Sequence, residues 1–410
     1  MAINKFVDRK GNTLLDLSVD SVTSENFVLA GKTYHGPDGL QHTGTLNPGP
    51  LDYSQYNFID YDGTLLYSYT DEQLDALTAL PAGPDHTADN LTFQEWNWTL
   101  ADLKAWDRTR ADRPIVGANL ITTDGKTYMY IDTPITNGTL SFSVTGTVNS
   151  IDWGDGTVNT TTEHTYANPG KYVVCLDLAE GAYFNFYRPL VNIIPAFITD
   201  IRLGNLEKLN DSSLNNATIL KTITIRSGVL SNTSFVGFKN CYNLKSIVIP
   251  NGTTNIGDSC FYYNYKLKTV SLPNNITELS HDSFRQCYSL KGLVFPETLN
   301  KIGSTAFNGI HTLNTMYLPK SLKIINDGSF GYTNLSYINI PDSVTSIEQG
   351  AFNECQGIIL DLSQQTKVIA LSSSILTNGA TCKILVPSSL LEQYKSASYW
   401  SNHASYMVGV

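Results

Sequence analysis

A single repeat period governs the C-terminal half of the chain. Phenylalanine recurs in steps of 23, 23, 23, 23 and 22 residues, at positions 238, 261, 284, 307, 330 and 352. Proline recurs with the same period, at positions 250, 273, 296, 319 and 341. Because two residue types share one period, the pattern predicts a stack of structural repeats rather than one globular core.

Each repeat predicts one coil of a solenoid. Leu244, Ile247 and Ile249 have the spacing of a short strand that faces inward, and Pro250 ends the strand because proline cannot donate to a ladder. One coil cannot bury its own apolar face, so at least three must stack. We therefore expect the solenoid to run from about Ile198 to the C-terminus, with one short strand per coil.

The repeat also predicts which side chains are buried. We expect the repeat phenylalanines to fill the gaps between coils. In the coil after Phe284, we expect Leu290, Leu293 and Phe295 to be buried, with Lys291 and Val294 facing outward.

Segments such as SIVIPNGTTNIGDSCF and YINIPDSVTSIEQGAF resemble the BspA-type leucine-rich repeats. The tail KILVPSSLLEQYKSASYW resembles the C-terminal cap of that family, a last strand followed by a helix that ends near an aromatic residue. The resemblance covers roughly Ile198 to Val410 and implies a solenoid that binds rather than catalyses. Ile358–Leu362 lacks the usual proline ending, and we expect it to form an edge coil.

The six cysteines show neither CxxC spacing nor a nearby histidine pair, so a zinc site is not expected. Cys241, Cys287 and Cys355 each follow a repeat phenylalanine by three residues, which predicts buried side chains. Cys241 and Cys287 should lie about 10 Å apart, two coils away from each other. A disulfide needs a separation below about 7 Å, so we expect six free thiols.

The fold class expected for the whole chain is mainly β, in four parts. Residues 1–50 form a small β N-terminal element and linker, and residues 51–120 a small mixed α/β (α+β) module. Residues 121–192 form an Ig-like β-sandwich, and residues 193–410 the leucine-rich-repeat solenoid with its C-terminal cap. The stretch FVLAGKTYHGPDGLQHTGTL in the first part resembles an element of phage tail fibres and other virion fibres, in which a strand pair ends in Gly-Thr.

The second part predicts two helices. Thr70 and Gln73 form a capping box for a helix through Leu80, and another helix should start after Thr99 and carry Leu100, Leu103 and Trp106. The three tryptophans of this part could form a sugar platform, but core packing is the favoured interpretation. They are Trp96, Trp98 and Trp106.

The third part shows strand alternation at Thr127–Ile131 and Leu140–Val144. Its motifs IDWGDG, HTY and PGKY resemble the polycystic-kidney-disease (PKD) Ig-like domain, which implies a spacer or adhesion module. Asp152 and Asp155 could bind calcium. A tight turn is favoured, because calcium needs six or more oxygen ligands.

Composition excludes several classes of protein. The net charge of −10 disfavours a nucleic-acid partner. The sequence contains no run of 18 apolar residues, so we expect no membrane insertion. The N-terminal MAINKFVDRKGN lacks the apolar segment of a secretory signal. The chain has no HExxH or GxSxG motif and no histidines at metal-ligand spacing, so we expect neither an enzyme, a cofactor nor a metal site.

These features favour a virion attachment protein of the tail-fibre, receptor-binding or head-fibre type. We expect it to contact other virion proteins through the N-terminus and a host cell-surface protein or glycan through the solenoid, and to form a homo-oligomer. The alternative is a bacterial cell-surface adhesin with the same solenoid, located on the bacterium rather than the phage particle.

The candidate ligand-binding residues are Lys245, Lys268, Lys291, Tyr317 and Tyr337. The lysines each follow a repeat leucine, and the tyrosines lie in later coils. A solvated strand face is the favoured interpretation of the lysine column. The other is a binding strip, cationic at one end and aromatic at the other, which would suit an acidic wall polymer.

Overall fold

The structure of the chain is a computed structural model. It describes residues 51–134, 136–185, 197–204, 214–225, 237–376 and 382–410, and four short strands within the first 50 residues. The chain divides into two compact units, Met1–Asp52 and Tyr53–Val410. As expected from the sequence, the fold is mainly β and ends in a β-solenoid.

The first unit contains two strand pairs. Strand β1 (Lys5–Val7) pairs antiparallel with β2 (Thr13–Asp16), and β3 (Thr33–His35) pairs antiparallel with β4 (Gln41–Thr43). The second pair lies within the stretch that resembles virion fibres. That likeness itself stays a prediction.

The second unit begins with a module, residues 53–122, built on a four-stranded sheet in the order β6-β5-β8-β7. Its strands are β5 (Tyr56–Ile59), β6 (Leu65–Tyr69), β7 (Leu91–Trp96) and β8 (Ile115–Thr122). Its helices are α1 (Asp71–Ala76), the 3-10 turn η2 (Thr87–Asp89) and α2 (Leu100–Lys104).

The local predictions for the module hold in part. Thr70 caps α1 in a reciprocal capping box with Gln73. The helix ends at Ala76 instead of Leu80, because the backbone of Leu77 is already extended. Helix α2 starts after Thr99 as predicted, although it ends before Trp106. The three tryptophans are buried in the module's core, which confirms the packing interpretation over a sugar platform.

A small β domain follows and shares its sheet with the solenoid. Strand β9 (Thr127–Thr133) pairs with β15 (Gly170–Leu178) on one side and with β17 (Ile198–Arg202) on the other. Strand β17 in turn pairs parallel with β18 (Thr222–Thr224), so one six-stranded sheet joins the β domain to the first coils. The other strands of the β domain are β10 (Gly138–Ser141), β11 (Ser143–Thr145), β12 (Val148–Asp152), β13 (Val158–Asn159), β14 (Glu163–Tyr166) and β16 (Tyr183–Asn185).

The WGDG segment of this domain forms a tight turn. Gly154 and Gly156 have φ angles of +80° and +93°, and Asp152 Oδ1 accepts a hydrogen bond from the Gly154 amide at 2.9 Å. The turn therefore follows the favoured interpretation of the motif. The likeness to the PKD domain stays a prediction.

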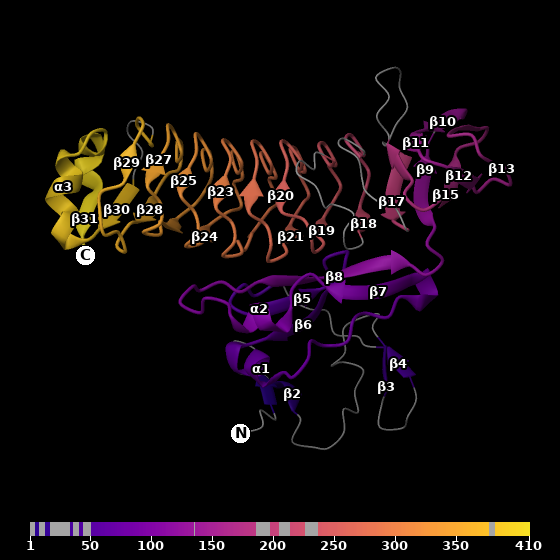
Figure 1. Ribbon diagram of the computed structural model, residues 1–410, viewed down its shortest axis with the longest axis horizontal. Helices are drawn as coiled ribbons and strands as arrows, with labels where there is room; N and C mark the ends of the chain where they lie inside the picture. The colour runs from indigo at the N-terminus through magenta and orange to yellow at the C-terminus, as the bar shows by residue number, and fades with distance from the viewer. Residues whose placement is uncertain are drawn as a thin grey trace. The chain divides into compact units, whose positions relative to one another are not determined.

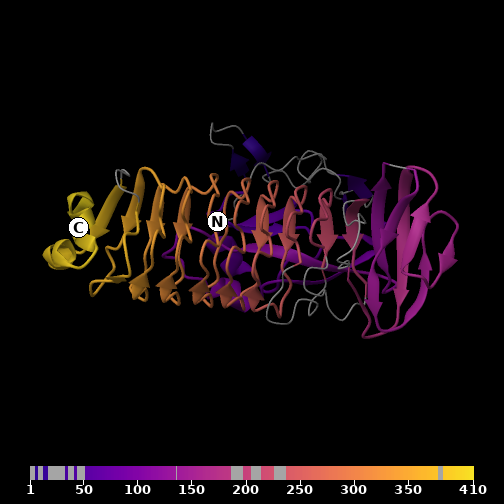
Figure 2. The same cartoon turned by 90° about the horizontal axis from the view of Figure 1, so that it is seen from above.

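The solenoid carries two rows of short parallel strands, and its coils follow one another in chain order (Figures 1 and 2). The first row contains β18, β19 (Ser246–Val248), β21 (Thr269–Ser271), β24 (Thr315–Tyr317), β26 (Tyr337–Asn339), β28 (Ile358–Asp361), β30 (Cys382–Val386) and β31 (Met407–Gly409). The second row contains β20 (Asn255–Ile256), β22 (Glu278–Leu279), β23 (Lys301–Ile302), β25 (Ile324–Ile325), β27 (Ser346–Ile347) and β29 (Ala370–Leu371).

The expectation of one strand per coil was therefore wrong. The apolar residue six positions after each repeat proline lies in a second strand: Ile256 pairs with Leu279 and Leu279 with Ile302, each one repeat further along the chain. Because the coils have equal length, these positions fall into parallel register and form a second ladder.

The repeat phenylalanines stack along the interior. Neighbouring ring centroids lie 5.1–5.7 Å apart with interplanar angles of 3–14°, and every ring is buried. Leu290, Leu293 and Phe295 are buried as well. These positions confirm the predicted core.

The C-terminal cap contains the predicted strand and helix, with two corrections. Strand β30 leads through η4 (Ser388–Leu390) into α3 (Leu391–Ser396) and η5 (Trp400–Tyr406), and the buried Trp400 indole donates to the Ile369 carbonyl at 2.7 Å. The chain then adds β31, which pairs parallel with β30, so β30 is not the last strand. Strand β28 is not at an edge either, because it pairs with both β26 and β30.

All six cysteines are free thiols, as predicted. Burial raises the pKa of the Cys382 thiol to about 11 and also raises that of Cys175, and both side chains are half-buried. The other four are fully buried: Cys241, Cys260, Cys287 and Cys355.

This arrangement predicts two classes of thiol reactivity. At pH 8 the raised pKa leaves little thiolate, so iodoacetamide should modify the native protein slowly, at Cys382 and Cys175 first. In urea without reductant, all six should be alkylated, as counted by intact mass spectrometry. A count below six in urea, or native labelling of Cys241 as fast as that of Cys382, would contradict the structure.

Candidate binding surface of the solenoid

The module covers part of the outer face of the first strand row. Ser246, Val248 and Ser271 alternate with core residues, yet all three are buried. A Cβ on Gly117 of β8 would lie 2.4 Å from Val248 Cγ1, so the backbone of β8 rests directly on this row. The row from β19 to β21 therefore offers no surface to an external ligand.

Val294 corrects one prediction. It was expected to face outward, but only 6% of it is exposed, and it packs in the module's core with residues such as Trp98 and Trp106. The repeat shows that Val294 points away from the coil interior, and the module supplies the cover. Residues 291–296 form no strand, so the first row is interrupted at this coil.

Buried hydrogen bonds fix the module to the row. The Asn97 side-chain amide donates to the Ile249 carbonyl at 3.0 Å and to Ser271 Oγ at 2.9 Å, and Asn97 Oδ1 accepts from the Gly117 amide at 2.7 Å. The Trp98 indole donates to the Leu272 carbonyl at 2.7 Å. Main-chain carbonyls of the row are thus satisfied by module side chains, which buried carbonyls require.

Arg110 makes a further set of contacts between the module and the solenoid. Its guanidinium donates to the carbonyls of Phe295 at 2.8 Å and Tyr317 at 3.2 Å, and to Glu297 Oε1 at 2.8 Å. It also forms a bidentate pair with Asp112, both bonds being 2.8 Å, and only 5% of its side chain is exposed. Arg110 therefore joins two successive coils.

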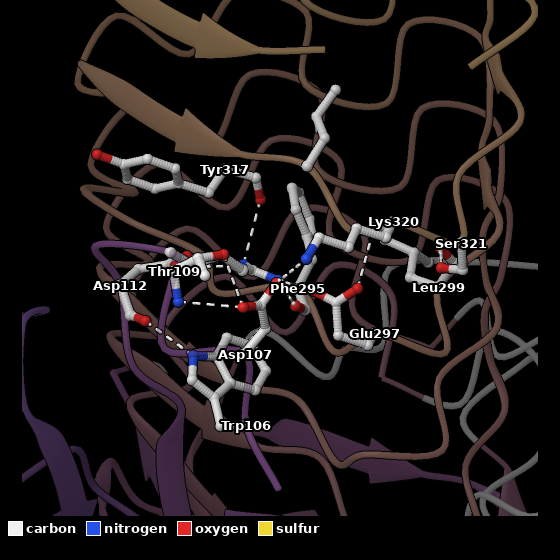
Figure 3. Close-up of polar contacts among 12 residues, drawn as sticks. Trp106, Asp107, Thr109, Asp112, Phe295, Glu297, Leu299, Tyr317, Lys320 and Ser321 are labelled. Atoms are coloured by element: carbon white, nitrogen blue, oxygen red, sulfur yellow. Dashed lines mark hydrogen bonds and ion pairs between the residues drawn. The ribbon is translucent and has the colours of Figure 1, made fainter. Parts of the chain in front are cut away.

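A second ion pair lies beside this contact (Figure 3). Lys320 Nζ lies 2.6 Å from Asp107 Oδ2, and the Lys320 amide donates to Glu297 Oε2 at 2.8 Å. Burial opposes ionisation of Asp107, but the hydrogen bonds from Lys320 and Thr109 prevail and lower its pKa to about 2. The contact thus remains charged at neutral pH.

The candidate tyrosines lie in the row at the rim of the covered area. Tyr317 and Tyr337 are half-buried with ring centroids 6.0 Å apart, and the Tyr337 hydroxyl donates to Asp361 Oδ2 at 2.7 Å. Burial, and then the hydrogen bond to Asp361, raise the pKa of Tyr337. The Tyr337 hydroxyl is therefore already engaged within the protein.

The candidate lysines form a separate column. Lys245, Lys268 and Lys291 are exposed, and each precedes the first-row segment of its coil. The Lys268 amide donates to the Lys245 carbonyl at 2.8 Å, so these two lysines occupy equivalent positions in neighbouring coils. The structure does not place the lysines and the two tyrosines in one column, because the tyrosines lie within the strands.

A tyrosine ladder that was not predicted from the sequence lies three positions before the lysine column in each coil. The ladder consists of Tyr242, Tyr265, Tyr288 and His311, each four residues after a repeat phenylalanine. Successive ring centroids lie 5.1, 5.2 and 5.9 Å apart with interplanar angles of 11–16°. The 23-residue spacing of these residues was the signal that could have revealed the ladder.

The electrostatics of these coils differ from those of the chain. Residues 238–292 contain six lysines or arginines and three aspartates or glutamates, whereas the whole chain has a net charge of −10.

Among the residues that the structure describes, no helix has the length and apolar character to cross a bilayer. The described ranges also contain no group of three or more His, Cys, Asp or Glu side chains placed to hold a metal.

Two parallel strand rows, a ladder of repeat phenylalanines and an α-helical cap define a leucine-rich-repeat solenoid. The family model of the BspA type leucine rich repeat region matches residues 196–314, 232–359 and 278–402, with six copies of the repeat. Together these matches cover just over half of the chain. The chain therefore belongs to the BspA-type leucine-rich-repeat family.

Solved structures show the same kind of repeat at low identity. A leucine-rich repeat protein from Bacteroides ovatus is 20% identical (TM-score 0.40) over 52% of this chain and 65% of its own. The leucine-rich repeat protein of T. pallidum is 24% identical (TM-score 0.34) over 43% and 80%. A leucine-rich cell surface protein from Faecalibacterium prausnitzii is 19% identical (TM-score 0.30) over 45% and 65%.

The match thus spans less than two thirds of the Bacteroides ovatus chain. No curated protein matches the chain in sequence.

Replacing Arg110 with methionine tests how the module is attached. The change leaves the Asp112 carboxylate without its ion-pair partner and leaves buried carbonyls without a hydrogen-bond donor. We therefore expect it to lower the free energy of unfolding by about 3–5 kcal/mol. The matched control is Arg108→Met, which removes ion pairs to Asp75 and Asp71 from a side chain that is 32% exposed and should cost about 1 kcal/mol or less. Urea unfolding of both variants measures the difference, and equal losses would contradict the assigned role of Arg110.

Proposed function

We propose that the protein is a non-enzymatic attachment protein that binds a host-surface protein or glycan through its solenoid. The observation that carries the proposal is the exposed edge formed by the tyrosine ladder and the lysine column, which repeats the same side chains once per coil. Proteins with BspA-type repeats are typically exposed at the surface, which agrees with a role in attachment.

The absence of a catalytic role is part of this proposal. Arg110, which is paired with Asp112 and Glu297, donates to main-chain carbonyls and holds the module on the solenoid. These charges are engaged in that contact, and the sequence has no nucleophile motif that would need them.

For the location, we propose a phage particle, with the N-terminal unit as the anchor to other virion proteins and a homo-oligomer as the assembled form. The support is the stretch FVLAGKTYHGPDGLQHTGTL with its strand pair β3–β4. The second candidate is a bacterial cell-surface adhesin, which membership of the BspA-type family favours. Antibody labelling of purified phage particles and of intact bacteria separates the two, because each location predicts label on only one of them.

Cell binding by two forms of the protein tests the proposed polarity. The solenoid cannot be tested without the β domain, because β9 and β17 share a sheet. The two forms are therefore the full chain and residues 53–410, which form one compact unit. Both should bind fluorescently detected host cells equally well, whereas residues 1–52 should not bind. Binding by residues 1–52 alone would reverse the polarity.

A further inference from the structure

We infer that the tyrosine ladder and the lysine column together form a binding site for an extended anionic polysaccharide. The inference rests on the proposed attachment function and names the class of ligand. It concerns one edge of the solenoid, between the repeat phenylalanines and the first strand row, in the coils from Tyr242 to His311.

The period of the ladder fits a polymer of sugars. Successive rings are 5.1, 5.2 and 5.9 Å apart, a distance comparable to the length of one sugar unit in an extended polysaccharide. An extended peptide advances only about 3.3 Å per residue, so its side chains would not meet one ring each. A polymer with one acidic sugar per repeat can place its charges along the lysines at the same interval.

The orientation of the rings favours an anionic ligand. Because neighbouring rings are nearly parallel, their faces cover one another, and edges and hydroxyl groups are what the solvent meets; 41% of Tyr288 is exposed. The edge of an aromatic ring carries the positive part of its quadrupole, and a tyrosine hydroxyl can donate a hydrogen bond. Both suit carboxylate and hydroxyl oxygens better than the apolar face of a neutral sugar.

Two further cations lie near the ladder. Lys239 and Arg285 both lie over the ring of Tyr262, at 5.0 and 5.6 Å from its centroid. That ring stacks on Tyr263 at 3.9 Å, and Tyr263 in turn contacts Tyr265 of the ladder at 5.6 Å. The ladder is therefore linked through Tyr263 to a second group of cations, of which Arg285 also pairs with Asp282 at 3.3 Å.

Tyrosine and lysine disappear from the two columns in the same coil. Tyr288 and Lys291 are the last of each, and the next coil has His311 and Asn314 at these positions. The repeat itself continues for several more coils with its core unchanged. Packing therefore does not require the change, whereas a ligand that contacts both columns accounts for their common end.

Binding of polygalacturonate to the full chain, with neutral dextran as the matched polymer, tests the inference. We expect saturable binding of polygalacturonate only, and weaker binding as salt rises. Replacing all three column lysines with serine should weaken it about tenfold, as expected for the loss of three exposed ion pairs. The charge-matched control removes three exposed lysines outside this edge: Lys323, Lys367 and Lys383.

A second set of variants tests the ladder. Tyr265→Ser with Tyr288→Ser should also weaken binding, whereas Tyr332→Ser with Tyr399→Ser, two exposed tyrosines outside the ladder, should not. These side chains are at least partly exposed, and a melting curve for each variant establishes that it is folded. Tyr265→Phe with Tyr288→Phe keeps the stacked rings and isolates the contribution of the hydroxyl groups.

The inference is overturned if dextran binds as well as polygalacturonate, if polygalacturonate does not bind, or if the charge-matched control loses as much affinity as the column variant. An acidic peptide that competes fully for the edge would also overturn it, in favour of a protein ligand. Cell binding distinguishes failure of the inference from failure of the proposed function. If residues 53–410 bind host cells but do not bind polygalacturonate, the inference fails and the proposed attachment function is retained.

Discussion

The structure depends on one constraint: a coil of this repeat cannot bury its own apolar face. Stacking solves the problem inside the solenoid, where the phenylalanine rings fill the space between coils. The first and last coils need other partners. At one end β17 continues the sheet of the β domain through β9, and at the other Trp400 and Tyr394 close the core beneath the cap helix.

The same requirement explains how the module determines the available surface. In a strand row of a solenoid, every second side chain points away from the interior and finds no packing partner within its own coil. In the coils from Ser246 to Val294 these side chains are covered by the module, and Asn97 and Arg110 satisfy carbonyls there. The covered row is therefore closed to an external partner in these coils, whereas the three column lysines and Tyr288 stay exposed.

Much of the solenoid could be predicted from sequence because its information is local and repeated. The period of Phe238 and its equivalents gave the core positions, and Thr70 with Gln73 gave the start of a helix. The second strand row was missed because two-residue strands are specified by the register between coils and not by their own residues. The cover over Val294 was missed because it comes from residues nearly 200 positions earlier in the chain.

The candidate site was predicted only in part, for a similar reason. The lysine column was visible as a repeat, but Tyr317 and Tyr337 were grouped with it although they occupy strand positions. To predict the tyrosine ladder, one must know that the residue four positions after each repeat phenylalanine lies on a turn and that its ring stacks on the equivalent ring of the next coil. The 23-residue spacing of Tyr242 and Tyr265 shows that they occupy equivalent positions, but the stacking of their rings follows only from the geometry of the coil.

The position of the module has a mechanical consequence. Its contacts extend from β19 to Lys320, and the tyrosine ladder extends over the same coils. A force applied between residue 53 and a ligand on the edge would pass through these side contacts, which brace several coils at once, instead of pulling one coil from the next. The coils after Tyr337 lie outside that path, so they would bear little of the tension even while the edge holds its ligand.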